Sequence, residues 1–131
     1  MSACVIDMGY DGDGWRVYHA EPRRARREHA CVECGRPIRH GERYEHAWGV
    51  SDDGESVAYK TCGSCASVRD VLFCSFFHGM LWEEIERSVR EEWAPYDAAP
   101  WATLARLPRP ARARILEMIE NAWNAREEAE S

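Results

Sequence analysis

The sequence predicts an α+β fold in which short strands are followed by a helical C-terminal region. Three observations predict it. Two Cys-x-x-Cys pairs are separated by 27 residues, apolar and polar residues alternate between the pairs, and apolar residues recur at helical spacing after residue 79. We therefore expect an N-terminal β-hairpin with a basic connector over residues 1–30, a cysteine-containing module over 31–78 and a helical extension over 79–131.

The first predicted element is the N-terminal β-hairpin. Two short apolar-rich segments, residues 3–8 and 15–20, flank a segment rich in glycine and aspartate over residues 9–14, which is typical of a turn. The two Asp-Gly pairs in this segment also suggest a calcium loop, but the downstream glutamate that such a loop requires is missing. A plain turn is therefore favoured.

A basic connector is expected after this hairpin, over residues 22–29. Residues 23–45 carry seven arginines and four glutamates, a net charge of +3, whereas the whole chain has a net charge of −6. The overall charge argues against a protein that coats nucleic acid without specificity. The local charge leaves two interpretations open, a solvated segment or a contact for nucleic acid or an acidic partner. The candidate contact residues are Arg23, Arg24, Arg26, Arg27, Arg36 and Arg39.

The cysteine pairs are Cys31 with Cys34 and Cys62 with Cys65. Without an export signal, such pairs indicate metal ligands rather than disulfides, and four thiolates form the closed tetrahedral site of a structural zinc ion. We therefore expect one bound Zn²⁺.

The remaining cysteines, Cys4 and Cys74, are expected to be buried thiols, because Cys74 lies among phenylalanines and Cys4 in the first hairpin. His40 or His46 is the alternative ligand if one cysteine of the pairs is not used.

A second β-hairpin accounts for the long separation of the cysteine pairs. Residues 43–50 and 56–61 alternate in polarity and flank a turn at 51–55. A helix is expected over residues 62–77, with the second cysteine pair in its first turn, where the helix N-terminus stabilises thiolates. The alternation places four residues on one face of the first strand, namely Tyr44, His46, Trp48 and Val50.

This order of cysteine pair, hairpin and second pair at a helix start resembles the treble-clef class of zinc modules over residues 31–77. The resemblance implies that the four paired cysteines are the zinc ligands. The segments CVECGRPIRHGERYEHAWGV and YKTCGSCASVRDVLF also resemble small zinc-finger proteins of tailed bacteriophages and prophages. That resemblance implies no known activity.

We expect a cytoplasmic protein, in the bacterial cytosol or, if phage-encoded, in the host cytosol. Residues 1–9 lack the basic cluster and long apolar run of a secretory signal. No stretch approaches the roughly 18 consecutive apolar residues of a membrane span. We therefore expect no membrane partner.

Some treble-clef proteins are nucleases, and this resemblance implies a histidine at the end of the first hairpin strand, an asparagine in the loop and a histidine in the helix. His46 could take the first position. The loop 51–55 has no asparagine, and His78 falls beyond the predicted helix. We therefore expect no catalytic residues and no enzyme activity.

The C-terminal region is predicted to contain amphipathic helices. Leu81, Ile85, Val89 and Trp93 recur every four residues, which predicts a helix over 79–93. A short helix is expected near Pro100 and a last helix from Pro110, a residue favoured at the first helical position.

The chain is therefore expected to be a binding protein, and two classes of partner compete. Another protein is the first expectation, because tryptophan is favoured at contact hot spots. Nucleic acid is the second, through the arginines of residues 23–43. A homodimer through the C-terminal helices also fits. The candidate protein-contact residues are Trp82, Trp93, Trp101 and Trp123.

Overall fold

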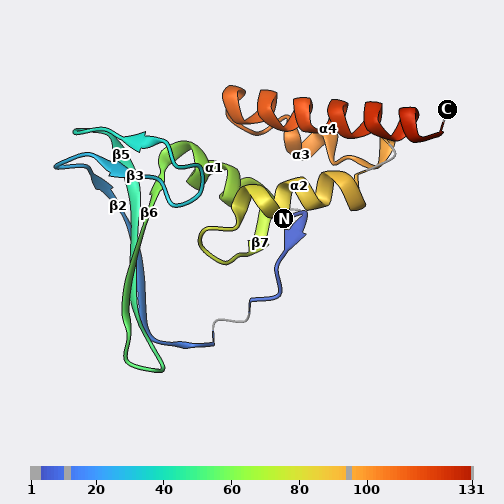
Figure 1. Cartoon of the computed structure of the whole chain (residues 1–131). Coiled ribbons are helices and arrows are strands. Elements are labelled where there is room, and N and C mark those ends of the chain that lie inside the picture. Colours follow the sequence, from blue (N-terminus) through green and yellow to red (C-terminus); the bar gives the residue numbers. More distant parts are fainter. Residues whose placement is uncertain (1–3, 11–12, 94–95, 131) are drawn as a thin grey trace.

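The structure of the chain is a computed structural model that describes residues 4–10, 13–93 and 96–130 (Figure 1). Three long strands stand side by side at one end of the molecule, and the helices extend away from them towards the other end. The predicted α+β class is confirmed in this general form. The elements are β1 (Ile6–Asp7), β2 (Trp15–Arg24), β3 (His29–Ala30), β4 (Pro37–Ile38), β5 (Arg43–Ser51), β6 (Ser56–Cys62), α1 (Gly63–Leu72), β7 (Phe73–Ser75), α2 (Leu81–Glu91), the 3₁₀ helix η1 (Tyr96–Ala98), α3 (Trp101–Leu104) and α4 (Arg109–Glu130).

The main sheet has the strand order β2-β5-β6 and is antiparallel throughout. The predicted hairpin between the cysteine pairs is confirmed as β5 and β6. Gly49 of β5 lies beneath the ring of Trp15, and a Cβ atom at this position would come within 2.8 Å of that ring. A glycine is therefore required at this position of β5, over which the side chain of Trp15 on the neighbouring strand β2 lies.

The predicted N-terminal hairpin is wrong for the described residues. β1 pairs in parallel with β7, and β2 pairs with β5. The physical reason is that each segment has a better partner elsewhere. Ile6 of β1 is 2% exposed in the core, and β2 is paired with β5 along almost its whole length. Alternating polarity predicts strands but does not choose their partners.

The basic connector is shorter than predicted, because Arg23 and Arg24 belong to β2. The chain then turns at Ala25, which is buried. Its backbone N–H donates to the carbonyl of Glu42 at 2.9 Å, and its carbonyl accepts from the N–H of Gly41 at 2.8 Å. These bonds hold the turn against the segment that leads into β5.

The helix predicted over 62–77 is α1, and it ends earlier, at Leu72. Phe73 is extended, and the carbonyl of Leu72 accepts a hydrogen bond from the N–H of Val5 at 2.9 Å. The pairing of β7 with β1 therefore competes with continuation of the helix, and this pairing could not be seen in the local pattern.

Cys4 and Cys74 form a disulfide, with their Cα atoms 5.3 Å apart. Both residues are exposed. The prediction of two buried thiols was wrong, because the unpredicted parallel pairing of β1 with β7 brings the two cysteines together at the protein surface.

The predicted C-terminal helices are confirmed as α2, α3 and α4. α2 packs against α4, and Ile85 of α2 and Ile115 of α4 are fully buried in a core that continues to Leu72 of α1. Within the part of the chain that the structure describes, no helix combines the length and apolar character that crossing a membrane requires.

Candidate metal centre and basic cavity

The four paired cysteines converge in space. The first pair lies in a tight turn, the cysteine knuckle, formed by residues 31–35. The N–H of Gly35 donates to the carbonyl of Cys31 at 2.9 Å, and Gly35 has a φ of +76°, a conformation that glycine adopts without strain. The second pair lies where β6 meets α1, with Cys62 as the N-cap residue of that helix.

The geometry of the cluster fits a tetrahedral metal site. The sulfur atoms of Cys31, Cys34, Cys62 and Cys65 all lie within 4.8 Å of one another, and those of Cys34 and Cys62 are 3.9 Å apart. Zinc–sulfur bonds of about 2.3 Å in a tetrahedron place the sulfur atoms about 3.8 Å apart. The four cysteines can therefore hold one metal ion, as the spacing predicts.

Several N–H groups of the described residues point at the sulfur atoms. The backbone N–H of Cys62 donates to Sγ of Cys31 at 3.3 Å, and that of Cys65 donates to Sγ of Cys62 at 3.5 Å. The indole Nε1–H of Trp82, on α2, donates to Sγ of Cys65 at 3.4 Å. Such bonds stabilise negative charge on sulfur and orient the ligands. The guanidinium of Arg114 lies 3.8 Å over the ring of Trp82.

The pKa values of the thiols differ because the sulfur atoms interact with one another. Hydrogen bonds from the side chains of Cys62 and Cys65 lower the pKa of Cys31. Hydrogen bonds with the side chains of Cys31 and Cys62 raise the pKa of Cys65, and burial raises that of Cys34. Four adjacent thiolates repel one another, so complete deprotonation of the cluster requires a cation at its centre.

No protein-family model, curated protein or solved structure matches this chain. The chemistry of its own residues is therefore the basis for every functional conclusion that follows.

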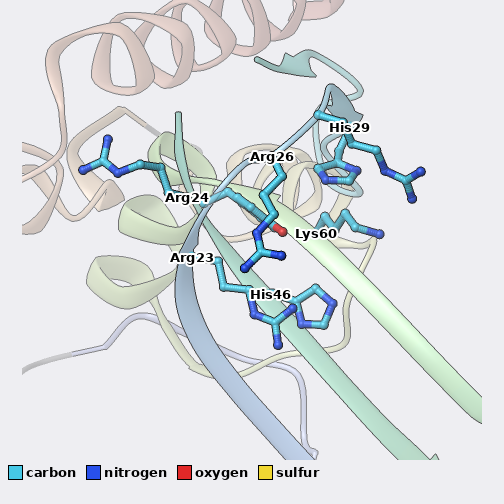
Figure 2. A pocket seen from close by; sticks show the side chains of 8 residues that line it. Arg23, Arg24, Arg26, His29, His46 and Lys60 are labelled. Carbon is cyan, nitrogen blue, oxygen red and sulfur yellow. The ribbon is translucent and has the colours of Figure 1, made fainter. Parts of the chain in front are cut away.

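A second site is the basic cavity, a hollow of about 940 Å³ on the face of the main sheet next to the turn after β2 (Figure 2). No carboxylate lines it among the residues that the structure describes. The lining residues are Arg23, Arg24, Arg26, Arg27, His29, Tyr44, His46 and Lys60. The register explains part of this grouping, because His46 of β5 lies opposite Lys60 of β6.

Two of the four arginines are held by other protein groups. Arg23 forms an ion pair with Glu21 at 2.6 Å. Arg24 donates to the carbonyl of Gly41 at 3.0 Å, and Figure 2 shows its side chain pointing away from the other labelled side chains.

The other cations of the cavity are uncompensated. The side chains of Arg26, Arg27 and Lys60 form no ion pair or hydrogen bond with any residue that the structure describes. Both arginines are exposed. These three side chains are therefore available to an anion from outside the chain.

Both histidines of the cavity are poor bases. Burial lowers the pKa of His29, as do the nearby charges of Lys60 and Arg27. Burial also lowers the pKa of His46, together with Arg23 and Lys60. In addition, Nδ1 of His46 is buried and has no hydrogen-bond partner among the described residues. A negative ligand would offset the repulsion and raise both pKa values.

Among the predicted contact residues, only the first four arginines line the cavity. Arg36 forms an ion pair with Glu42 and also donates to the carbonyl of Pro37 at 3.1 Å. Arg39 is exposed and is not part of the cavity lining. The arginine cluster of the sequence therefore divides into a group at the cavity and a group beside the knuckle.

His46 and His78 lie on opposite sides of the main sheet. His46 lines the basic cavity with Lys60, whereas His78 stacks on Tyr59 with ring centroids 4.3 Å apart. Neighbouring residues of a strand point to opposite faces, so Tyr59 and Lys60 place the two histidines apart. They do not form a joint site.

The candidate protein-contact tryptophans have roles in packing. Trp93 is 5% exposed and belongs to the core, while Trp82, Trp101 and Trp123 are partly buried. Trp82 contacts the cysteine cluster, as described above. Their abundance in the C-terminal region is thus accounted for, at least in part, by the packing of the helices.

Sequence reasoning did not assign His29, Tyr44, His46 and Lys60 to a basic site. The signal that could have found two of them was the hairpin register, since a turn at residues 51–55 pairs position 46 with position 60. To place His29 at the cavity, one must know the course of the chain after β2, and no local sequence pattern predicts it.

Proposed function

We propose that this chain is a non-enzymatic, zinc-stabilised module that binds nucleic acid through the basic cavity. The observation that carries the proposal is a cavity lined by four arginines, one lysine, two histidines and one tyrosine, with no carboxylate among the described residues. The whole chain, in contrast, has a net charge of −6. Such segregation of positive charge is the usual electrostatic footprint of a nucleic-acid site.

The metal supports the fold in this proposal. Four cysteine ligands suit one structural Zn²⁺ and leave no coordination position for a reactive water. The cysteine knuckle, the β5–β6 hairpin and the ligands at the start of α1 follow the treble-clef order, and we propose this class for the module. The opposite placement of His46 and His78 is a further argument against nuclease chemistry.

Phosphate groups match the uncompensated cations. A guanidinium presents paired N–H donors that fit phosphate oxygens, and an ammonium adds a compact positive charge. Arg26 and Arg27 supply the first kind of donor and Lys60 the second. A phosphodiester backbone offers negative charges in series, which suits cations distributed along the wall of a cavity.

A protein partner stays a prediction with weaker support, because the tryptophans that suggested it are buried or partly buried. An acidic protein segment is the competing ligand for the cavity itself. The homodimer, the cytosolic location and the phage origin also stay predictions.

The test is the binding of a labelled oligonucleotide of about 20 nucleotides, followed by fluorescence anisotropy over a salt series starting near about 50 mM. The variant replaces Arg26, Arg27 and Lys60 with alanine. If each contacts one phosphate of a single strand, the slope of log affinity against log salt becomes shallower by about 2, at about 0.7 for each contact.

The matched control is the triple replacement of Arg90, Arg106 and Arg109 with alanine. These arginines are exposed and lie outside the cavity, and the control changes the net charge by the same amount. We expect its salt slope to equal that of the unaltered protein. Equal losses of affinity in the two variants would refute the proposal. It would also be refuted if the unaltered protein did not bind the oligonucleotide but bound polyglutamate, and the cavity variant bound polyglutamate less well.

A further inference from the structure

An exposed tryptophan lies next to the basic cavity on the same face of the sheet. Trp48 is two residues along β5 from His46, and side chains two apart on a strand share a face about 6.6 Å apart. Trp48 is 36% exposed, although large apolar side chains are normally covered. Trp48 is not one of the residues that line the cavity, but it follows the lining residues Tyr44 and His46 on the same face of β5.

The neighbours of Trp48 leave its ring accessible on one side. On β2, His19 lies opposite Trp48, with ring centroids 6.4 Å apart. On β6, the residue opposite Trp48 is Ala58, which carries only a methyl group. At the position directly opposite Trp48, β6 therefore adds no large side chain beside the indole.

Glu21 of β2 lies opposite His46 of β5, and its charge is compensated. Its carboxylate pairs with Arg23 at 2.6 Å and contacts Nε2 of His19 at 3.4 Å, and these contacts lower its pKa, Arg23 contributing most. Glu21 therefore fixes the side chains between the cavity and the tryptophan without adding an unpaired negative charge.

We infer that the ligand is a single-stranded nucleic acid, which lies along β5 with phosphates in the basic cavity and a base stacked on Trp48. The inference rests on the proposed function and names its substrate class. Proteins that bind single strands combine a positive groove with aromatic rings that stack on unpaired bases. In a duplex the bases already stack on one another, and an exposed indole offers them little.

The basic groups and the indole have separate tasks in this arrangement. Arg26, Arg27 and Lys60 set the salt dependence of binding, because they replace the counterions of the phosphates. Trp48 contributes a stacking contact that salt hardly affects. The two contributions can therefore be measured independently.

The experiment compares Trp48→Ala with the unaltered protein on an oligothymidylate of about 12 nucleotides and on a duplex of similar length. We expect Trp48→Ala to weaken single-strand binding by roughly 5- to 150-fold, the range for loss of one stacked base. The salt slope should not change, and duplex binding should be weak in both proteins. Trp48→Phe should restore most of the affinity.

The matched control is Phe77→Ala, because Phe77 is an exposed aromatic residue, 44% accessible, that does not line the basic cavity. Its affinity for the oligonucleotide should equal that of the unaltered protein. Equal metal content in all variants shows that the fold is retained.

Failure of this inference differs from failure of the proposed function. If Trp48→Ala binds the single strand normally while the triple variant of Arg26, Arg27 and Lys60 does not, the base contact is wrong and the phosphate site stands. If the protein binds the duplex more tightly than the single strand, the base contact is likewise wrong and the phosphate site stands. If the unaltered protein binds neither nucleic acid, both are wrong.

Discussion

The carboxylate of Glu33 accepts a hydrogen bond from the backbone N–H of Leu81, at 3.0 Å, and a second from the N–H of Gly79, at 2.9 Å. Glu33 lies between the two cysteines of the knuckle, and Leu81 is the first residue of α2. The side chain therefore caps the N-terminus of that helix from the candidate metal centre. A change at the cysteine knuckle is therefore expected to affect the start of α2, and a change at the start of α2 is expected to affect the knuckle.

The first prediction is that Glu33→Ala destabilises the protein by about 1–2 kcal/mol, since it leaves two N–H groups at the start of α2 without an acceptor. Hydrogen exchange should accelerate most in residues 79–91, while the metal content stays the same. Glu55→Ala, in an exposed turn, is the control and should change neither quantity. Unchanged exchange in α2 would show that the cap contributes nothing.

The second prediction concerns the metal. The protein should contain about one equivalent of zinc, and Cys62→Ser should lose most of it and unfold residues 31–72, because metal affinity contributes directly to the stability of such a site. Metal analysis and circular dichroism measure the two effects. Cys74→Ser is the matched control and should retain its zinc. A Cys62→Ser protein with full zinc content would contradict the assignment of the ligands.

The third prediction concerns acid stability. Burial, and then the charge of Arg69, lowers the pKa of His78 from 6.5 to about 4. The unfolded chain therefore binds a proton at this position before the folded chain does. The stability from neutral His78 is complete above about pH 6.5, is lost as the pH falls towards about 4, and falls no further below that.

This loss should amount to about 1–2 kcal/mol, since the ring is partly exposed and solvent screens the effect. It is measured as the difference in unfolding free energy between the unaltered protein and His78→Phe at each pH, which removes the contribution of the metal ligands. His40→Phe, at an exposed position, is the control and should lose as much unfolding free energy at acid pH as the unaltered protein does. A pH-independent difference for His78→Phe would refute the prediction.

The fourth prediction is that nucleic acid binds more tightly as the pH falls from about 8 to about 6. In the free protein the pKa values of His29 and His46 are lowered by burial and by the cations beside them. A bound phosphate favours their protonated forms and raises these pKa values, so binding takes up protons. Isothermal titration calorimetry in buffers of different ionisation enthalpy measures this uptake.

Replacing both cavity histidines with asparagine should make the affinity nearly independent of pH over this range. His40→Asn is the control, since His40 does not line the cavity, and it should keep the pH dependence. Equal pH profiles for all three proteins would mean that the histidines do not face the ligand.

The parts of the fold that depend on local pattern could be predicted from the sequence. The spacing of the paired cysteines predicts the four metal ligands, and the turn at residues 51–55 predicts the β5–β6 hairpin. The helical repeat from Leu81 to Val89 similarly gives α2. In each case the residues that interact are close in sequence or carry a distinctive chemistry.

The contacts between distant segments could not be predicted. Nothing near Ile6 indicates that it pairs with Phe73, or that Cys4 consequently meets Cys74. The basic cavity likewise exists because Ala25 turns the chain back over the sheet. Such arrangements depend on which pairing of distant segments buries the apolar residues of the whole chain best. Alternating polarity does not indicate that pairing.

The disulfide between Cys4 and Cys74 closes a covalent ring that contains the metal ligands and the lining of the basic cavity, since both lie between these two cysteines, which are 70 positions apart in the chain. A protease that cuts one peptide bond inside this ring opens it but releases no fragment. The two pieces separate on a denaturing gel only after a thiol reductant is added. Residues 75–131 lie outside the ring, so one cut there detaches a piece at once.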